Sequence, residues 1–307
     1  MSRKYKHLLA RISFLLLLAV LYLSINRLFF NEEKEASTPS NNGVDKVEVH
    51  YIDVGQGDSI LIQAGGHSML IDAGENNKGT IVVNYLKSKH IKNLDYVVGT
   101  HPHSDHVGGL DTVIRSFSVD NVILPDVVHS TKTFEDVLDS IQNKSIHTIK
   151  AKAGDTYTLG PSSFTILAPN STDYDDLNNY SVVIKLTFRS TSFLFTGDAE
   201  KLSEGEILDR GYDLSADVIK IGHHGSSYSS SPDFLEAVNP SYAVISVGKG
   251  NKYGHPATET LQALADRNIS VYRTDKQGTV VFTSDGKNIS VNTDNYKITN
   301  ADLESKK

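Results

Sequence analysis

Short apolar runs recur along the chain from Val47 onward, separated by glycine-rich turns. Their length and β-branched content predict strands. Apolar positions with helical spacing predict helices near residues 80–90, 134–143 and 257–267. Strands are predicted at 47–54, 59–64, 67–74, 94–101, 119–125, 163–169, 181–188, 192–198, 217–225 and 242–248, and across 271–293. This alternation predicts an α/β fold, an αββα sandwich of two mixed β-sheets flanked by helices.

The first thirty residues differ from the rest of the chain. Four lysines and arginines between Arg3 and Arg11 precede an uninterrupted apolar run at 12–25. This order is typical of an export segment, and it predicts that the remainder of the chain lies outside the cytoplasm. As a helix the run spans only about 20 Å, against about 30 Å for a bilayer core, and no small-residue cleavage site follows it. Residues 1–30 are therefore predicted to be a signal peptide or an N-terminal membrane anchor, with the anchor favoured.

A polar stretch separates the apolar run from the region of strands. Residues 31–46 contain Pro39 and Gly43, which favour a linker. The strands and helices then predict one domain over 47–297, and residues 298–307 are predicted to be a polar tail. The protein is expected to be extracytoplasmic, either secreted or anchored to the membrane by its N-terminal segment, and no protein partner follows from the sequence.

The composition narrows the chemistry that this domain can perform. Apolar residues make up 39% of the chain and charged residues 22%, as in ordinary globular proteins. The net charge of −7 counts against tight non-specific binding to a polyanion but leaves a local basic groove open. The chain has no cysteine, which excludes disulfides, thiolate ligands and a cysteine nucleophile. A metal site would have to use histidine and carboxylate.

The sharpest chemical feature is the segment HPHSDH, which directly follows an apolar strand. Its four potential ligands are His101, His103, Asp105 and His106. On a strand-to-loop turn they can face a single point, and imidazole and carboxylate are the ligands that zinc, manganese or iron accept when thiolates are absent. The alternative is a solvated loop with chance histidines, which this spacing disfavours.

Two further strands end in residues of the same kind. The segment FLFTGD places Asp198 after an apolar run, where a carboxylate can bridge two metal ions. The segment DVIKIGHHG places His223 and His224 after another. A polar residue after a strand often only starts a turn. Beside HPHSDH, ligation is favoured for Asp198 and for one of the two histidines.

Together these motifs resemble the metallo-β-lactamase superfamily. The segments HYIDVGQGDSILI, MLIDAG, NNYSVVIKL, KIGHHGSS and GNKYGHP are similar, more specifically, to the metallo-β-lactamase-like domain of ComEC-type DNA-internalisation proteins. The resemblance covers residues 47–292 and implies two divalent metal ions, zinc or manganese. The ligands that it implies are His101 and His103 for the first ion, Asp105 and His106 for the second, Asp198 as the bridge, and His223 or His224, preferably His224, to complete the second site.

The sequence departs from the superfamily pattern at one ligand. The superfamily supplies a further histidine upstream of the bridging aspartate, where this chain has Asn178-Asn179-Tyr180-Ser181. An amide is a poor zinc ligand, so the first site is predicted to be weak. Asn179 is predicted to occupy the missing position, with Ser181 as the next candidate. In a second departure, one short apolar segment cannot form a polytopic DNA channel, so DNA import by this chain alone is not expected.

Weaker predictions concern residues around the motifs. Asp105 is expected to orient the attacking water. His255 is a candidate for contact with the substrate or for protonating the leaving group, and it can equally be structural. Asp72 is predicted either to orient a ligand histidine or to cap a turn. Asp58 is predicted to shape the loop beside the site. Ser226 can hydrogen-bond a phosphate or simply form a turn of small residues.

The predicted function is that of a metal-dependent hydrolase of phosphoester or phosphodiester bonds that uses a metal-activated water. The ComEC-type resemblance carries the preference for phosphoesters and makes DNA one candidate substrate. One alternative is hydrolysis of another small ester, a nucleotide or a lactam. The other is a non-catalytic DNA-uptake accessory protein with the same fold, which would not need the complete ligand set.

Overall fold

The computed structural model describes residues 45–304 of the chain. The predicted signal peptide or anchor at 1–30 and nearly all of the predicted linker at 31–46 lie outside these residues, so both stay predictions. Between residues 45 and 304, no helix combines the length and the apolar character needed to cross a bilayer.

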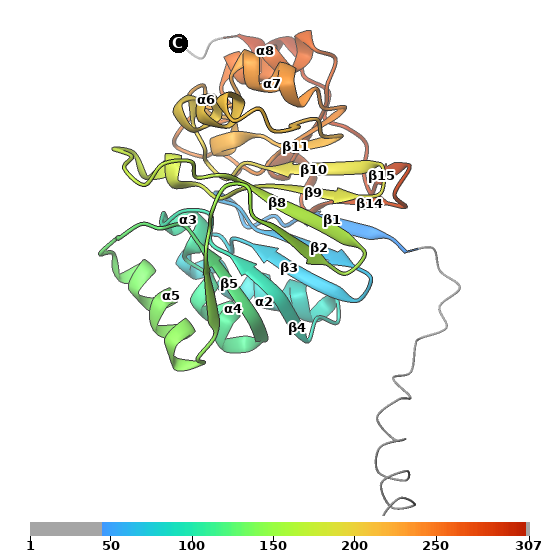
Figure 1. The fold of residues 1–307 in the computed structure, drawn as a ribbon. Coiled ribbons are helices and arrows are strands. Elements are labelled where there is room, and N and C mark those ends of the chain that lie inside the picture. Colours follow the sequence, from blue (N-terminus) through green and yellow to red (C-terminus); the bar gives the residue numbers. More distant parts are fainter. Residues whose placement is uncertain (1–44, 305–307) are drawn as a thin grey trace, which may run out of the picture. The chain divides into compact units, whose positions relative to one another are not determined.

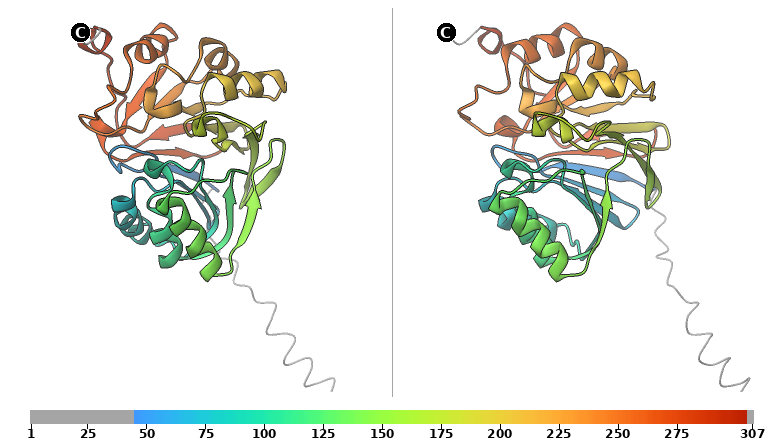
Figure 2. Two further views of the ribbon diagram at one scale, coloured as in Figure 1. Left: turned by 90° about the vertical axis from the view of Figure 1, so that its left-hand side faces the viewer. Right: turned by 60° about the vertical axis from the view of Figure 1, so that its left-hand side comes forward.

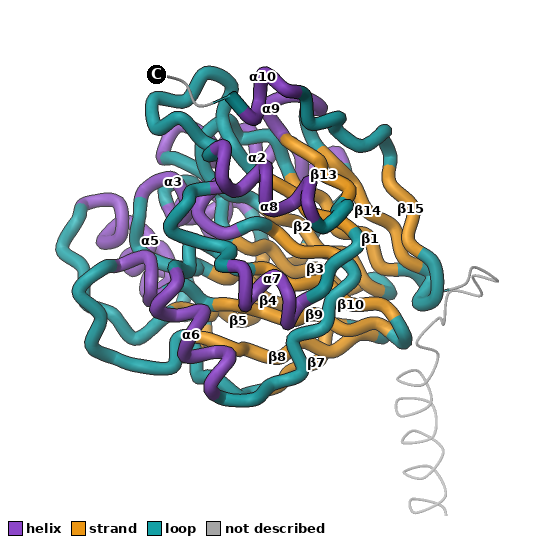
Figure 3. Tube along the Cα trace, turned by 90° about the horizontal axis from the view of Figure 1, so that it is seen from above, coloured by secondary structure: helices purple, strands orange, loops and turns teal. Residues whose placement is uncertain are grey.

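The first sheet has eight strands in the order β15-β14-β1-β2-β3-β4-β5-β6. Neighbours are antiparallel from β15 to β3 and parallel from β3 to β6. The strands are β1 (Val47–Tyr51), β2 (Ile60–Ala64), β3 (His67–Ile71), β4 (Asn93–Val98), β5 (Ser118–Leu124), β6 (His147–Lys150), β14 (Val280–Ser284) and β15 (Ile289–Val291). Viewed from above, β15 lies at the outer edge beside β14 (Figure 3).

The second sheet has seven strands in the order β13-β12-β11-β10-β9-β8-β7 and repeats the same design. Neighbours are antiparallel from β7 to β10 and parallel from β10 to β13. The strands are β7 (Thr156–Leu159), β8 (Ser162–Ala168), β9 (Val183–Phe188), β10 (Thr191–Phe195), β11 (Val218–Lys220), β12 (Tyr242–Ile245) and β13 (Ser270–Arg273). Both sheets are mixed, as predicted.

Helices cover the outer face of each sheet (Figures 1 and 2). The first sheet carries α2 (Gly79–Ser88), α4 (Leu110–Ser116) and α5 (Lys132–Asn143), and the second carries α6 (Lys201–Asp209), α7 (Pro232–Val238) and α8 (Thr258–Asp266). The short elements are η2 (Asn76–Lys78), α3 (Ser104–Val107), η3 (Leu177–Tyr180), η4 (Gly222–Gly225), α9 (Thr274–Gln277) and α10 (Asn300–Leu303). This arrangement confirms the predicted αββα sandwich.

The strands read as nearly continuous apolar runs because both of their faces are buried. On β2, Ile60 and Ile62 belong to the core between the two sheets, whereas Leu61 packs under α2 and α4. On β9, Ile184 lies between the sheets and Val183 lies on the helix-covered side. Successive side chains of a strand point to opposite faces, so central strands such as β2 and β9 contribute to two of the three apolar clusters.

Residues 296–303 pack against the domain, although residues 298–307 were predicted to be a polar tail. The backbone N–H of Tyr296 donates to Val271 O at 2.7 Å. Ile298 and Leu303 then pack on the cluster beneath α7 and α8, and Asp302 caps the N-terminus of α10. Two apolar side chains in a polar context suffice to hold this segment, which averaged composition does not reveal.

The closing strands also differ from the sequence prediction at one point. One turn of helix, α9, stands between β13 and β14, where continuous strand was expected. The Gln277 side chain accepts from the backbone N–H of Arg273 at 2.6 Å and fixes this turn. The detour lets β13 end in the second sheet and β14 begin in the first.

Candidate metal centre

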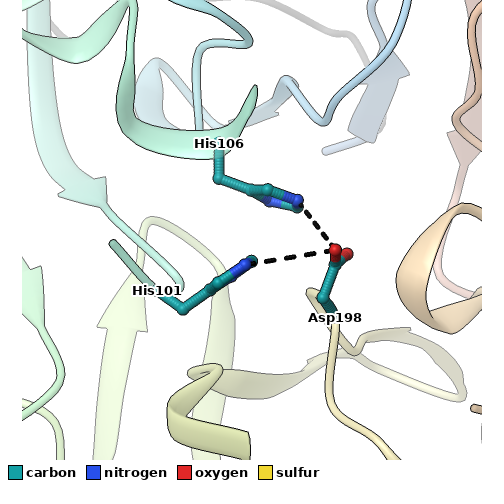
Figure 4. Close-up of side chains that lie close together, drawn as sticks. All are labelled: His101, His106 and Asp198. Atoms are coloured by element: carbon teal, nitrogen blue, oxygen red, sulfur yellow. Dashed lines mark ion pairs between the residues drawn. The ribbon is translucent and has the colours of Figure 1, made fainter. Parts of the chain in front are cut away.

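The candidate site lies where the loops after β3, β4, β10 and β11 meet. These strands belong to the parallel parts of the two sheets, whose carboxyl ends commonly hold ligands. The loop after β4 carries the HPHSDH segment, and α3 places Asp105 and His106 within its single turn. Asp198 follows β10 and faces His106 from the other half of the domain (Figure 4).

Four ligand atoms converge in what we call the second cluster, formed by Asp105, His106, Asp198 and His224. Asp198 Oδ2 lies 3.2 Å from His106 Nε2 and 3.4 Å from His224 Nε2. His224 Nε2 lies 3.3 Å from Asp105 Oδ2 and 3.3 Å from His106 Nε2. A tetrahedral ion with ligands at 2.0–2.1 Å requires ligand atoms about 3.4 Å apart. The donor set and its spacing therefore fit a divalent cation.

The first cluster is looser and shares Asp198 with the second. His101 Nε2 lies 3.0 Å from His103 Nδ1 and 4.0 Å from Asp198 Oδ2. His101, His106 and Asp198 offer ligand atoms that all lie within 4.8 Å of one another (Figure 4). The same carboxylate oxygen thus faces both clusters, which is the position that a bridging ligand needs.

Hydrogen bonds behind the histidines set which nitrogen faces the clusters. Asp72 Oδ2 lies 2.8 Å from His106 Nδ1, and Ser246 O lies 2.9 Å from His224 Nδ1. Because a carboxylate and a carbonyl only accept, both Nδ1 atoms carry a proton, and both Nε2 atoms face inward, where their lone pairs would meet a cation. Asp72 therefore orients a candidate ligand, the first of its two predicted roles.

His101 is oriented in the same way by hydroxyl groups. The Thr100 hydroxyl donates to Asp72 Oδ2 at 2.7 Å, so its proton is committed there. Thr100 Oγ1 must then accept from His101 Nδ1, 3.1 Å away, and the Nε2 lone pair of His101 faces His103 and Asp198.

The structure separates the two neighbouring histidines. His224 is buried and joins the second cluster, whereas His223 lies on the pocket wall, 3.8 Å from Asp198 Oδ2, with its Nδ1 3.2 Å from Glu200 Oε1. Both have left-handed backbone angles, with φ of 48° and 53°, an unfavourable conformation for residues with a β-carbon. The strained turn is what swings adjacent side chains to different positions, and it favours His224 as the ligand.

The prediction for Asn179 requires correction. Its amide oxygen, the atom that would ligate a metal, accepts from the backbone N–H of Ser203 at 3.2 Å and so serves helix α6. Ser181 is the residue at the site: its Oγ lies 3.3 Å from His101 Nδ1 and accepts from Asp198 N at 3.0 Å. The 3-10 turn η3 produces this difference, because it directs Asn179 and Ser181 to different neighbours.

A buried lysine, Lys220, belongs to the candidate site and was missed by the sequence reasoning. It is fully buried on β11, and its Nζ lies 2.5 Å from Asp58 Oδ2, 2.7 Å from Gly197 O and 3.6 Å from Asp198 Oδ1. Asp58 therefore does more than shape a loop, since it balances the charge of this lysine. A lysine within the apolar run VIKI, just before HHG, was the available signal.

Gly57 brings Asp58 close to the motif helix. Its φ is +121°, and a Cβ there would lie 2.1 Å from Asp105 O. The glycine lets the loop approach α3 so that Asp58 N donates to Asp105 O at 3.2 Å.

The charges of the site call for more positive charge than the protein supplies. Burial alone would raise the pKa of Asp198, but the neighbouring His106 and His224 hold it well below its usual range. Burial alone would lower the pKa of both histidines, but the carboxylates, Asp198 foremost, raise it well above its usual range. The buried atoms Asp58 Oδ1 and Asp198 Oδ1 have no hydrogen-bond partner. Protons on the histidines thus occupy a position that suits a cation.

A pocket of about 310 Å³ opens onto the clusters. Its lining residues are Gln56, His103, Ser104, Asp105, Asp198, His223, His224, Tyr253 and His255. Burial, together with the charges of His223 and His224, lowers the pKa of His255 to about 4, so this ring is neutral at pH 7. This shift counts against His255 as a proton donor, and contact with the substrate stays a prediction.

Ser226 lies in a turn and not on the pocket wall. Its side chain is 2% exposed, and its hydroxyl accepts from the backbone N–H of Tyr228 at 3.2 Å. The turn, one of its two predicted roles, is the one that the structure supports.

The comparisons with known proteins agree with this geometry. The profile of the metallo-β-lactamase superfamily matches residues 52–249. ComE operon protein 3 of Bacillus subtilis is 32% identical over 76% of this chain and 33% of its own length, and competence protein ComA of Neisseria gonorrhoeae is 29% identical over 75% and 31%. This chain spans about a third of the length of these relatives.

A solved structure supports the fold. CmlA, a diiron β-hydroxylase from Streptomyces venezuelae, is 14% identical and superposes with a TM-score of 0.51 over 76% of this chain and 53% of its own. Members of the superfamily normally bind divalent metals and are generally hydrolytic. The chain belongs to the metallo-β-lactamase superfamily and is similar to the corresponding part of ComEC-type competence proteins.

Proposed function

We propose that this chain is a metal-dependent hydrolase of phosphoester bonds, with phosphodiesters, DNA among them, as the favoured substrates. The observation that carries the proposal is the second cluster, where each of four ligand atoms from two halves of the domain lies 3.2–3.4 Å from at least one of the others. A protein that only binds DNA would not need two histidines and two carboxylates at this spacing.

The proposed ion-binding residues follow from the two clusters. They are Asp105, His106, Asp198 and His224 for one ion, and His101, His103 and the shared Asp198 for the other. A divalent cation, zinc or manganese, supplies charge that activates a water and polarises the attacked ester. The first cluster offers fewer close ligands and is proposed to bind its ion more weakly.

The chain's own residues position the reactants. Asp105 lines the pocket and accepts a hydrogen bond from the attacking water, as proposed from the sequence. His255, whose ring is neutral at pH 7, has one nitrogen that donates and one that accepts, and it is proposed to hold the substrate. His103 and His223 form the walls between these two positions.

The relatives support the substrate class. They are named as a ComE operon protein, a competence protein and a recombination protein, and the motifs of this chain resemble those of DNA-internalisation proteins. A phosphodiester carries a negative charge on the phosphoryl group that is attacked, and two bound cations would neutralise that charge. Because this chain spans only about a third of the relatives' length, their complete activities are not transferred to it.

The test is a metal-reconstituted assay of the purified full chain in mild detergent. The chain, stripped with chelator and reloaded with zinc or manganese, is assayed on bis(p-nitrophenyl) phosphate, short DNA strands, a phosphomonoester and a lactam. We expect phosphodiester turnover that depends on metal. Asp198→Ala should lose turnover and at least one bound ion, whereas Asp139→Ala, an exposed carboxylate on α5, should keep both.

Two outcomes would overturn the proposal. Turnover of the lactam alone would favour the alternative that the protein hydrolyses a small molecule other than a phosphoester. DNA binding without turnover, with either metal loaded, would favour the non-catalytic accessory.

A further inference from the structure

The loop between β12 and α8 carries an exposed tyrosine, Tyr253, to the mouth of the pocket. Tyr253 is 56% exposed, yet it lines the same pocket as Asp198 and His224. An exposed aromatic ring buries apolar surface and stacks favourably when a second flat group packs against its face. Because Tyr253 lies beside the two clusters, we expect a group of the substrate to pack against its ring.

The loop is held in shape by one side-chain amide. Asn251 Oδ1 accepts from the backbone N–H groups of Tyr253 at 3.1 Å and His255 at 3.0 Å. Its Nδ2 donates to Gly248 O at 3.1 Å and to His255 O at 2.6 Å. The N–H of Gly248 also donates to Gln56 Oε1 at 3.2 Å, which ties the base of the loop to the segment after β1. Tyr253 therefore stands on a braced turn, and its binding position is fixed in advance.

One face of the tyrosine is already backed by another ring. The rings of Tyr253 and His255 are nearly parallel, with centroids 5.8 Å apart and an interplanar angle of 19°. His255 in turn meets His223 edge to face, with centroids 5.6 Å apart. The stack runs from the pocket mouth to its wall beside Asp198, so a ligand can reach the clusters and the outer ring together.

The loop is locally basic although the chain is acidic. Residues 249–255 contain Lys249 and Lys252 and no carboxylate, whereas the whole chain has a net charge of −7. Lys252 Nζ lies 5.1 Å from the centre of the Tyr253 ring. Aromatic rings interleaved with lysines are the means by which proteins hold single strands of nucleic acid, through stacked bases and paired phosphates.

We propose that Tyr253, backed by His255, is a stacking platform for a nucleobase next to the scissile phosphodiester, and that it makes the site select unpaired nucleic acid over phosphodiesters without a base. This inference rests on the proposed function. The inference extends the proposed function because it names the residue that sets specificity, Tyr253, and the substrate group that this residue contacts, a nucleobase. A paired base is covered on both faces within a duplex, so only an unpaired base can take this position.

The test compares two variants on two matched probes, with the metal-loaded full chain. The probes are a fluorescently labelled oligothymidylate and a strand of the same length whose sugars carry no bases. Tyr253→Leu keeps apolar bulk but removes the ring, and Tyr253→Phe keeps the ring. Fluorescence anisotropy measures binding, and cleavage assays give kcat and KM separately.

We expect Tyr253→Leu to weaken oligothymidylate binding by about five- to a hundred-fold, with KM rising in step and kcat nearly unchanged. Tyr253→Phe should match the wild type, and the baseless strand should bind all three proteins alike. Equal loss on both probes, or no loss for Tyr253→Leu, would overturn the inference. Absence of turnover in the wild type would instead defeat the proposed function, and anisotropy would still decide whether the platform exists.

Discussion

Replacing Lys220 by methionine should destabilise the protein severely, because the substitution leaves a buried carboxylate without its counter-charge. The Nζ of Lys220 contacts Asp58 Oδ2 at 2.5 Å and Gly197 O at 2.7 Å, and both Lys220 and Asp58 are inaccessible to solvent. Breaking a buried ion pair by removing one partner costs about 3–5 kcal/mol of unfolding free energy. At about 2–4 °C per kcal/mol for a domain of this size, Tm should fall by about 6–20 °C.

The assay is thermal and urea unfolding in chelator, so that no metal ion replaces the lost charge. The double variant Lys220→Met with Asp58→Asn removes both charges and should recover a large part of the loss. Lys185→Met is the matched control. Lys185 Nζ lies 2.9 Å from Asp213 Oδ2, but the Asp213 side chain is 79% exposed, and such exposed pairs contribute about 0–1 kcal/mol to the free energy of unfolding. A loss below about 1 kcal/mol for Lys220→Met, or a double variant no better than the single one, would refute the charge-balance argument.

Two further predictions follow from the described contacts, and a third follows from the sequence of the N-terminal segment. Ser181→Ala should lower metal stoichiometry, measured by elemental analysis, because Ser181 contacts both His101 and Asp198, whereas Asn179→Ala should not. Burial lowers the pKa of His50 from 6.5 to about 4, so the folded protein keeps this ring neutral. The free energy of unfolding should therefore fall by up to about 1.4 kcal/mol per pH unit as the pH drops from 6.5 towards 4, because the unfolded chain takes up the proton first. Urea unfolding of His50→Gln should lack that slope, and an unchanged slope would contradict it. A reporter that is active only outside the cytoplasm, fused to the C-terminus, should be active, and activity of a cytoplasm-only reporter would reverse the predicted topology.

The sequence predicted the layers of this fold well, because strands buried on both faces leave long apolar runs. It also predicted which side chains meet at the candidate site, since HPHSDH concentrates four of them within six residues. It failed where the direction of a side chain decides the role. Asn179 lies inside the 3-10 turn and Ser181 directly after it, and only the geometry of this turn shows which of the two meets His101.

The site of Lys220 was hidden for a related reason. Its neighbours in the chain are apolar, and its partner Asp58 lies 162 positions away. A pairing of that range depends on two sheets closing against each other, which local patterns do not record.

The sheet order makes completion of this domain late in synthesis. β1 pairs with β14, so the first sheet keeps an open edge until residues 280–284 have emerged. Asp198 and His224 likewise join His106 only after the second half of the chain is present. An unpaired strand edge invites wrong pairing. A chain that crosses a membrane before folding would meet this hazard on the far side, and newly arrived chains there would depend on rapid closure of β14 against β1.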